Sequence, residues 1–308
     1  MKYNSVLVIG SINMDLVIKT ERYPTKGETV IGGDFFQLPG GKGANQACTV
    51  SRLGGDVGFI GACGNDIFGQ EVTDNLIRLG VDTSDMYRVE ESTGIAAITI
   101  EKDGDNRIIV AQGANNKITV DMIDRLEDKI KQAEVILLQL EIPRETVLRA
   151  IELAKFYETT VILDPAPAQK LPEEVYSKID YLLPNVGELD ILIKDYKLNS
   201  LEEKAAKLLD LGVKNIIVTR GEKGVSLFSK NKQKEYPACQ VKAVDTTAAG
   251  DAFAGALAYG LHKNWNEDKS INFATVVAGL SVTKIGAQSS LPSLTEVIDF
   301  SNKESKAI

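Results

Sequence analysis

The chain has 308 residues, of which 44% are hydrophobic and 25% are charged, a composition ordinary for a globular protein. Its 35 basic and 43 acidic residues give a formal net charge of -8 without a basic stripe, which argues against nucleic acid as a partner. No signal-peptide pattern opens the sequence and no apolar run approaches the length of a membrane span, so we expect a cytoplasmic protein without a membrane partner.

The cysteine and histidine content limits the kinds of catalytic and metal-binding site that the chain can form. Cys48, Cys63 and Cys239 are odd in number and widely separated, as expected for reduced thiols. The single histidine, His262, argues against a histidine-based triad and against a multi-histidine zinc site. We therefore expect a carboxylate to move any proton that the chemistry requires.

Short apolar runs alternate with amphipathic segments along the chain, which predicts repeated β-α units and a mostly parallel sheet covered by helices on both faces. Strands are predicted at residues 5–10, 57–62, 135–140, 160–164, 181–184 and 215–219. One predicted helix carries Phe68, Val72, Leu76 and Leu79 on a single face, and another begins at Ser200 with a capping box to Glu203. Leucine followed by glycine at 53–54, 79–80 and 211–212 predicts three helix ends.

Two segments do not follow this alternation of strands and helices. Residues 15–38 are β-rich without an evident helix, and residues 92–112 are typical of a hairpin that turns through Asp103, Gly104 and Asp105. We expect strands from about 12–38 and 94–112 to form a small separate sheet, placed as a lid over a cleft. Because no Pro/Ser-rich linker interrupts the sequence, residues 1–308 are interpreted as one α/β domain with a lid.

The stretch PGGKGANQA, residues 39–47, has the glycines of a ligand-binding loop. It is not a Walker loop, because Lys42 is followed by Gly43 and then by no Ser or Thr to hold magnesium. A second glycine-bearing stretch, VDTTAAGDAFAGALAYGL at 244–261, places small residues before an apolar helix and Asp251 in its first turn. Backbone amides there would face an anion, and Asp251 would accept a proton. From this motif alone, a helix that merely carries a favourably placed acidic residue is an equally good interpretation.

Taken together, these stretches resemble the two signatures of the ribokinase-like (PfkB) carbohydrate kinases, GG near the N-terminus and DTxGAGD about two hundred residues later. The resemblance runs from GSINMD at 10–15 to KIGAQSSLP at 284–292. Ala248 departs from the glycine usual in the broad family, although AAGD resembles the ribokinase branch itself. The resemblance implies a ribokinase-like three-layer α/β/α sandwich with a mostly parallel central sheet and a small β-sheet lid.

The resemblance also implies roles for individual residues. Sugar binding would fall to Asn13, Asp15, Gly41, Lys42, Gly43, Asn45, Glu141 and Asp251, with Asp251 as general base. ATP would contact Asn185, Thr219, Gly221, Gly224, Ala249, Gly250 and Thr275, and the anion hole would consist of Ala248, Ala249, Gly250 and Asp251. Glu188 would organise Mg²⁺ through water, and potassium would be held by Asp245, Thr247, Ser281, Lys284, Gly286 and Ser290, Lys284 acting through its carbonyl.

Plainer structural alternatives exist for several of these residues, and without the second motif the residues from Gly41 to Asn45 fit a glycine-rich helix start. Asn13 and Asp15 fit a turn after a strand, Asn185 fits a helix cap, and Glu141 fits an exposed acid at a strand end. The pattern from Thr219 to Gly224 fits a β-turn, and the potassium residues fit a buried helix that ends at Gly286.

The activity implied is ATP-dependent phosphorylation of D-ribose at its 5-hydroxyl, giving D-ribose 5-phosphate and ADP. Mg²⁺ would accompany ATP, K⁺ would activate, and a homodimer would form through the lid strands. The alternatives are a kinase for 2-deoxyribose, fructose or a nucleoside, and a non-catalytic sugar-binding regulator, against which Asp251 and the helix-start glycine argue. A dinucleotide-dependent oxidoreductase is disfavoured, because VIGSIN lacks the Gly-x-Gly-x-x-Gly pattern after the first strand.

Overall fold

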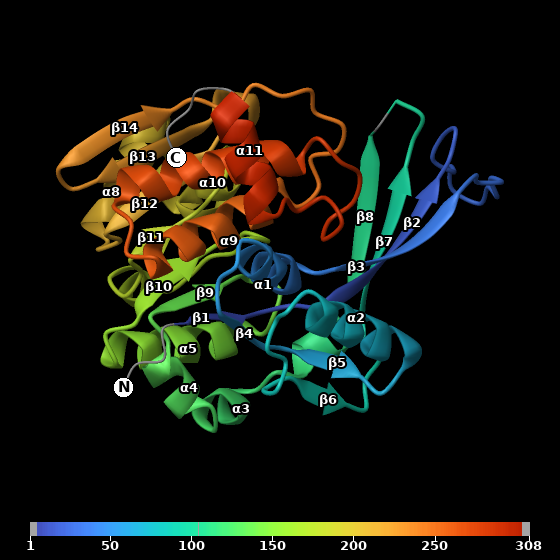
Figure 1. The fold of residues 1–308 in the computed structure, drawn as a ribbon, viewed down its shortest axis with the longest axis horizontal. Helices are drawn as coiled ribbons and strands as arrows, with labels where there is room; N and C mark the ends of the chain where they lie inside the picture. Colours follow the sequence, from blue (N-terminus) through green and yellow to red (C-terminus); the bar gives the residue numbers. More distant parts are fainter. Residues whose placement is uncertain (1–4, 104, 304–308) are drawn as a thin grey trace.

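The computed structural model describes residues 5–103 and 105–303, and its centre is an eight-stranded sheet (Figure 1). In sheet order the strands are β14 (Lys232–Tyr236), β13 (Val225–Ser229), β12 (Asn215–Thr219), β11 (Tyr181–Leu182), β10 (Thr160–Leu163), β9 (Val135–Leu138), β1 (Val6–Ile9) and β4 (Val57–Ile60). Pairing is parallel except at β12–β13 and β13–β14. The predicted mostly parallel sheet is confirmed, and β13–β14 is an antiparallel addition that was not predicted.

Helices cover both faces of this sheet, which confirms the three-layer sandwich. Strand residues alternate between two buried clusters, since Val6 and Val8 belong to one and Leu7 and Ile9 to the other. The first face is covered by α1 (Lys42–Arg52), α2 (Ile67–Arg78), α9 (Ala249–His262), α10 (Glu267–Ser281) and α11 (Leu294–Lys303). The second is covered by α3 (Val120–Asp124), α4 (Glu127–Gln132), α5 (Arg144–Phe156), α6 (Glu173–Tyr176), α7 (Val186–Leu192) and α8 (Leu201–Asp210).

Local sequence signals account for several helix ends. The predicted helix through Phe68 and Leu76 is α2, and the capping box at Ser200 opens α8 as predicted. Gly54, Gly80 and Gly212 follow the C-caps of α1, α2 and α8 with φ of 78°, 83° and 106°, so the three predicted ends are confirmed.

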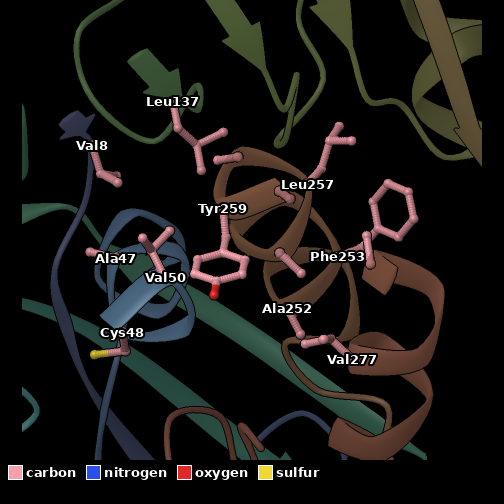
Figure 2. Close-up of a cluster of buried hydrophobic side chains, with 14 of the residues drawn as sticks. Val8, Ala47, Cys48, Val50, Leu137, Ala252, Phe253, Leu257, Tyr259 and Val277 are labelled. Atoms are coloured by element: carbon pink, nitrogen blue, oxygen red, sulfur yellow. The ribbon is translucent and has the colours of Figure 1, made fainter. Parts of the chain in front are cut away.

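Packing of α1 against α9 brings the two glycine-bearing stretches together. Val8 and Leu137, which are paired on neighbouring strands, lie beneath these helices with Val50 of α1 and Leu257 of α9 (Figure 2). A Cβ on Gly255 of α9 would lie 2.6 Å from the Cβ of Thr49 in α1, so this crossing requires glycine. The close crossing places the first turns of α1 and α9 side by side.

A separate four-stranded sheet stands beside the sandwich, in the order β3 (Phe35–Gly40), β2 (Asn13–Lys19), β7 (Gly94–Ile100) and β8 (Asn106–Ala111) (Figure 1). Its strands come from the two segments predicted to leave the β-α repeat, with β3 continuing two residues past the expected boundary. Of the predicted hairpin turn, Gly104 lies outside the described residues. The short strands β5 (Ala62–Gly64) and β6 (Tyr87–Val89) form a third sheet.

Among the residues that the structure describes, three 3₁₀ helices complete the connections: η1 (Gly113–Lys117), η2 (Lys194–Tyr196) and η3 (Gly221–Lys223). None of the helices in residues 5–103 and 105–303 combines the length and the apolar character needed to cross a bilayer.

Candidate active site

A cavity of about 260 Å³ lies where β10, β11 and β12 end. Its wall consists of Lys42, Asp164, Leu183, Asn185, Glu188, Thr219, Thr246, Ala248, Ala249, Gly250, Asp251 and Phe253. Open α/β sheets bind ligands at the carboxyl ends of their parallel strands. The cavity also receives the first residues of α1 and α9, which are the two stretches singled out in the sequence.

The N-terminus of α9 presents backbone amides that can bind an anion. The helix begins at Ala249, so Ala249 and Gly250 belong to its first turn instead of preceding it. Ala252 makes the first intrahelical bond, to the carbonyl of Ala248, and no side chain among the described residues caps the helix. The amides of Gly250 and Asp251 therefore precede the hydrogen-bonded ladder, at the positive end of the helix dipole.

Ala248 adopts the left-handed conformation, with φ of 60° and ψ of 11°. A non-glycine residue pays roughly 1–2 kcal/mol for this geometry, and such strain concentrates at functional sites. The conformation explains why glycine would suit position 248, the point at which this chain departs from the resemblance.

The Asp251 carboxylate is buried, with 4% of the residue exposed, and is held by donors from α1. Asn45 Nδ2 donates to Oδ2 over 2.8 Å, and Gln46 Nε2 donates to Oδ1 over 3.2 Å. Lys42 Nζ lies 3.8 Å from the same Oδ1. Neutral donors and a nearby cation thus hold this buried carboxylate in one orientation.

Asp164 is a second buried carboxylate of the cavity, and it was not singled out in the sequence. Gln46 Nε2 donates to its Oδ2 over 2.9 Å, and Lys42 Nζ lies 4.0 Å from the same atom. Burial raises the pKa of Asp164 to about 7, against the lowering effect of Lys42. Gln139 Nε2 donates to Gln46 Oε1 and so fixes which end of the Gln46 side chain faces the two carboxylates.

A signal for Asp164 was present in the sequence. It is the last residue of the predicted strand 160–164 and directly follows β10, as an acid at the sheet edge where ligands bind. Glu141 likewise comes after the neighbouring strand β9.

Lys42 keeps 31% of its side chain exposed while lying among carboxylates. Burial acts to lower the pKa of Lys42, but the charges of Asp251, Asp164 and Glu141 outweigh it, and the pKa is raised above the usual value. Lys42 therefore remains a cation at any ordinary pH, placed between the two cavity carboxylates.

The residues expected to bind sugar gather at the base of the small sheet. Asp15 is 9% exposed, and burial together with the charges of Glu141 and Asp251 raises its pKa to about 7. Glu141 accepts hydrogen bonds from Ser11 Oγ and, over 3.3 Å, from the Lys42 amide. Asn45 Oδ1 is buried without a hydrogen-bond partner among the described residues, so it is available to a donor on a ligand.

Close backbone contacts define the same region. A Cβ at Gly43 would lie 2.8 Å from backbone atoms of Gly10 and Ser11, and one at Gly40 would lie 2.3 Å from a carboxylate oxygen of Asp15. Gly41, the N-cap of α1, has φ of 90°. The glycines of PGGKG thus permit a tight turn against the end of β1.

The residues expected to bind ATP divide into two groups. Asn185, Thr219, Ala249 and Gly250 line the cavity. Gly221 and Gly224 lie on the turn after β12 with φ of 57° and 82°, outside the cavity wall. Thr275 lies on α10, also outside the wall, and its hydroxyl donates to the Ile271 carbonyl over 2.9 Å.

Asn185 and Glu188 form a capping box at the start of α7, so the plainer reading of this pair is present in the structure. The Asn185 side chain accepts from the Glu188 amide, and Glu188 Oε2 accepts from the Asn185 amide, both over 2.8 Å. Both residues also line the cavity. A capping role and a ligand role are therefore compatible here.

The residues expected to hold potassium lie on the loop before α9, at the end of α10 and on the loop that follows α10, and Asp245 joins the two loops. Its Oδ1 accepts from the Thr247 amide over 2.9 Å, and its Oδ2 accepts from the Gly286 amide over 2.8 Å. The Lys284 ammonium pairs with Glu296 at 2.5 Å. The alternative of a buried helix ending at Gly286 is wrong, because α10 ends at Ser281.

The hydroxyls of Ser281 and Ser290 each donate to a carbonyl three residues earlier, over 2.8 Å. Within residues 5–103 and 105–303, no three His, Cys, Asp or Glu side chains form a metal site by themselves.

Known proteins are similar to this chain over nearly its whole length. Residues 4–294 match the profile described as pfkB family carbohydrate kinase. The ribokinase of Lactococcus lactis is 42% identical, with 95% of each chain covered, and the deoxyribokinase of Salmonella typhi is 36% identical, with 96% of this chain and 98% of that one covered.

The structure of Arabidopsis thaliana ribokinase complexed with ribose and ATP superimposes with a TM-score of 0.89 at 33% identity, covering 96% of this chain and 97% of that chain. The fold, the cavity between α1 and α9, and these similarities lead to one conclusion: the chain belongs to the pfkB family of carbohydrate kinases.

Proposed function

We propose that this protein transfers the γ-phosphoryl group of ATP to the 5-hydroxyl of D-ribose, giving D-ribose 5-phosphate and ADP. The observation that carries the proposal is the buried Asp251 carboxylate in the first turn of α9, beside amides that precede the helix ladder. The similarity to the Arabidopsis ribokinase complexed with ribose and ATP supports ribose as the acceptor.

In the proposed reaction, Asp251 Oδ accepts the proton of the attacking hydroxyl as the hydroxyl oxygen bonds to the γ-phosphorus. The bond from that phosphorus to the β-γ bridging oxygen breaks, and ADP leaves with this oxygen. General-base catalysis of this kind contributes roughly 10²–10⁴-fold. The amides of Gly250 and Asp251, with Ala249 beside them, stabilise negative charge on the transferring phosphoryl group. Lys42 adds a positive charge beside Asp251. Asn45 and Gln46 hold Asp251 in place, which supplies orientation before the chemistry begins.

The cavity fits Mg²⁺ carried in with ATP. Glu188, Asn185 and Asp164 supply oxygen atoms to the same wall, and Mg²⁺ usually takes one or two carboxylates together with water and substrate phosphates. When bound, the ion would neutralise phosphate charge. We assign Glu188 to hold it through water, with Asp164 as a second acid on that side.

The two loops joined by Asp245 fit a monovalent cation. The Lys284 ammonium is paired away with Glu296, so it does not repel a cation held by backbone carbonyls. We propose that K⁺ lies between these loops, where its charge would add to the positive end of α9.

Acceptor choice separates this proposal from its rivals. The 36% identity to a deoxyribokinase makes 2-deoxyribose the strongest competing acceptor. ADP release from ATP should be measured with ribose, 2-deoxyribose, fructose and adenosine, with and without K⁺. We expect ribose to give the highest kcat/KM and K⁺ to raise it. Turnover on none of the four would favour the sugar-binding regulator. A rate of ADP release that is the same with and without K⁺ would contradict the proposed cation site.

Sugar binding should depend on the ionisation of Asp15. Its pKa is about 7, so it is largely protonated at a pH of about 6 and largely ionised at about 8. Because the ionised carboxylate accepts two sugar hydroxyls, we expect the KM for ribose to fall about tenfold between those pH values. Asp15→Asn should raise KM and abolish this dependence. A dependence that persists in Asp15→Asn would assign the titration to another group.

We propose a single kinase domain in which the small sheet acts as a lid and joins two copies into a homodimer. Ile109, Phe35 and Ile108 on its strands are 67%, 53% and 51% exposed, which leaves apolar area available for a partner. Sedimentation velocity should give a dimer for the unaltered protein and a monomer for Ile109→Lys. An unaltered protein that stays monomeric at high concentration would contradict this assembly.

A further inference from the structure

Asn115 is a buried side chain at the base of the lid that no sequence motif singled out. It lies on η1, which follows the last lid strand, β8, and only 1% of it is exposed. Asn115 Oδ1 accepts from the Ile12 amide over 2.9 Å, and Nδ2 donates to the Ile12 carbonyl over 3.0 Å. The side chain therefore pairs with the backbone of residue 12 as a neighbouring strand would.

The second hydrogen of Asn115 Nδ2 reaches the sugar-site residue Asn13. It is donated to Asn13 Oδ1 over 2.7 Å. The Ile12 amide can only donate and the Ile12 carbonyl can only accept, so they determine which end of Asn115 carries the nitrogen. Asn115 in turn determines which end of Asn13 is oxygen, and this leaves Asn13 Nδ2 as the group presented to a ligand.

The bases of the lid strands enclose this pair. Asn13 begins β2 and is in register with Gly94, the first residue of β7, and with Gly40, the last residue of β3. A Cβ at Gly94 would lie 2.2 Å from Asn13 Oδ1 and 2.3 Å from Asn115 Nδ2, so the backbone of β7 lies directly against this hydrogen bond. Movement of the lid base therefore moves the pair.

We propose that Asn115 is a positioning residue, which fixes Asn13 as a hydrogen-bond donor toward the sugar and links that orientation to the base of the lid. This inference rests on the proposed ribose kinase activity. A sugar hydroxyl that accepts a hydrogen bond from Asn13 Nδ2 can still donate its own hydrogen to an acceptor. The Asp15 carboxylate, two residues later on β2, is such an acceptor. A fixed donor beside a fixed acceptor recognises a pair of hydroxyls in one orientation.

A double-mutant cycle on ribose turnover tests this role. We expect Asn115→Ala to raise the KM for ribose about tenfold or more, with kcat and the KM for ATP changed less than about threefold. If Asn115 acts through Asn13, the same substitution in an Asn13→Ala background should change the KM for ribose less than about twofold. Full and equal effects in both backgrounds would overturn the proposal.

Variants that separate folding from positioning complete the test. Asn115→Asp keeps the size of the side chain and the bond from the Ile12 amide, but its second oxygen forces Asn13 to turn its nitrogen away from the sugar; we expect the KM for ribose to rise as in Asn115→Ala. Thr159→Val loses buried hydrogen bonds to the carbonyls of Ile130 and Ala133, and should lower Tm without changing the KM for ribose. A folded Asn115→Asp with unchanged KM would overturn the role of Asn115, whereas unaltered protein without ribose turnover would overturn the proposed function.

Discussion

Replacing Asp251 by asparagine is expected to lower kcat for ribose phosphorylation by about 10²–10⁴-fold while changing the KM for ribose and for ATP only a few-fold. The substitution keeps the shape of the side chain and removes the proton acceptor. It also has a structural cost. Both Asp251 oxygens accept amide hydrogens, from Asn45 and from Gln46, so the new NH₂ group faces a donor and stability falls by about 1–3 kcal/mol.

The measurement is steady-state turnover at saturating ATP together with thermal unfolding of each protein. Asp299→Asn, an exposed acid on α11, is the matched control and should retain full activity. A folded Asp251→Asn enzyme that kept a tenth or more of the activity would show that proton abstraction by Asp251 is not a major part of catalysis.

Replacing Lys42 by methionine is expected to have the second large effect on ribose phosphorylation. The ammonium lies 3.8 Å from Asp251 and 4.0 Å from Asp164, and it lowers the pKa of Asp164. Its loss leaves two neighbouring buried carboxylates without their cation, a change that typically costs several kcal/mol when fully buried and less here because Lys42 is partly exposed. We expect kcat/KM for ribose to fall about 100-fold, with the KM for ATP changed less than about threefold.

The pH profile gives an independent reading of the same variant. Without the Lys42 charge, the pKa of Asp164 rises, so the acidic limb of the rate profile should move to higher pH. Lys42→Arg should restore part of the activity, and Lys155→Met on the exposed side of α5 should behave as the unaltered protein. Weakened ATP binding with ribose binding spared would contradict the assignment of PGGKGANQA to the sugar.

The sequence predicted most of the central sheet because buried parallel strands appear as apolar runs bounded by turn signals. It did not reveal the β13–β14 hairpin, since the polar edge strand Lys232–Tyr236 exposes most of its residues and lacks an apolar run. Helix ends were predictable where the signal is local, as in the capping box at Ser200 and the glycine after Leu79.

The site was predictable where one motif contains both the helix start and its functional residue, as with Lys42 and Asp251. Gln46, Gln139 and Asn115 were missed because their roles depend on partners from other elements, which only the packing of strands and helices brings within hydrogen-bond distance. The assignment of Thr275 to ATP stays a prediction: its hydroxyl donates to the Ile271 carbonyl of its own helix, and the residue lies outside the cavity wall.

The product of ATP and ribose provides the most direct test of the proposed activity. The phosphorus NMR spectrum of the product, recorded without proton decoupling, reports how many protons lie on the phosphorylated carbon. Phosphate on the 5-hydroxyl is coupled to two C5 protons and should give a triplet, with ADP released in equal amount. A doublet from a single coupled proton, or inorganic phosphate as the only new signal, would contradict transfer to the 5-hydroxyl of ribose.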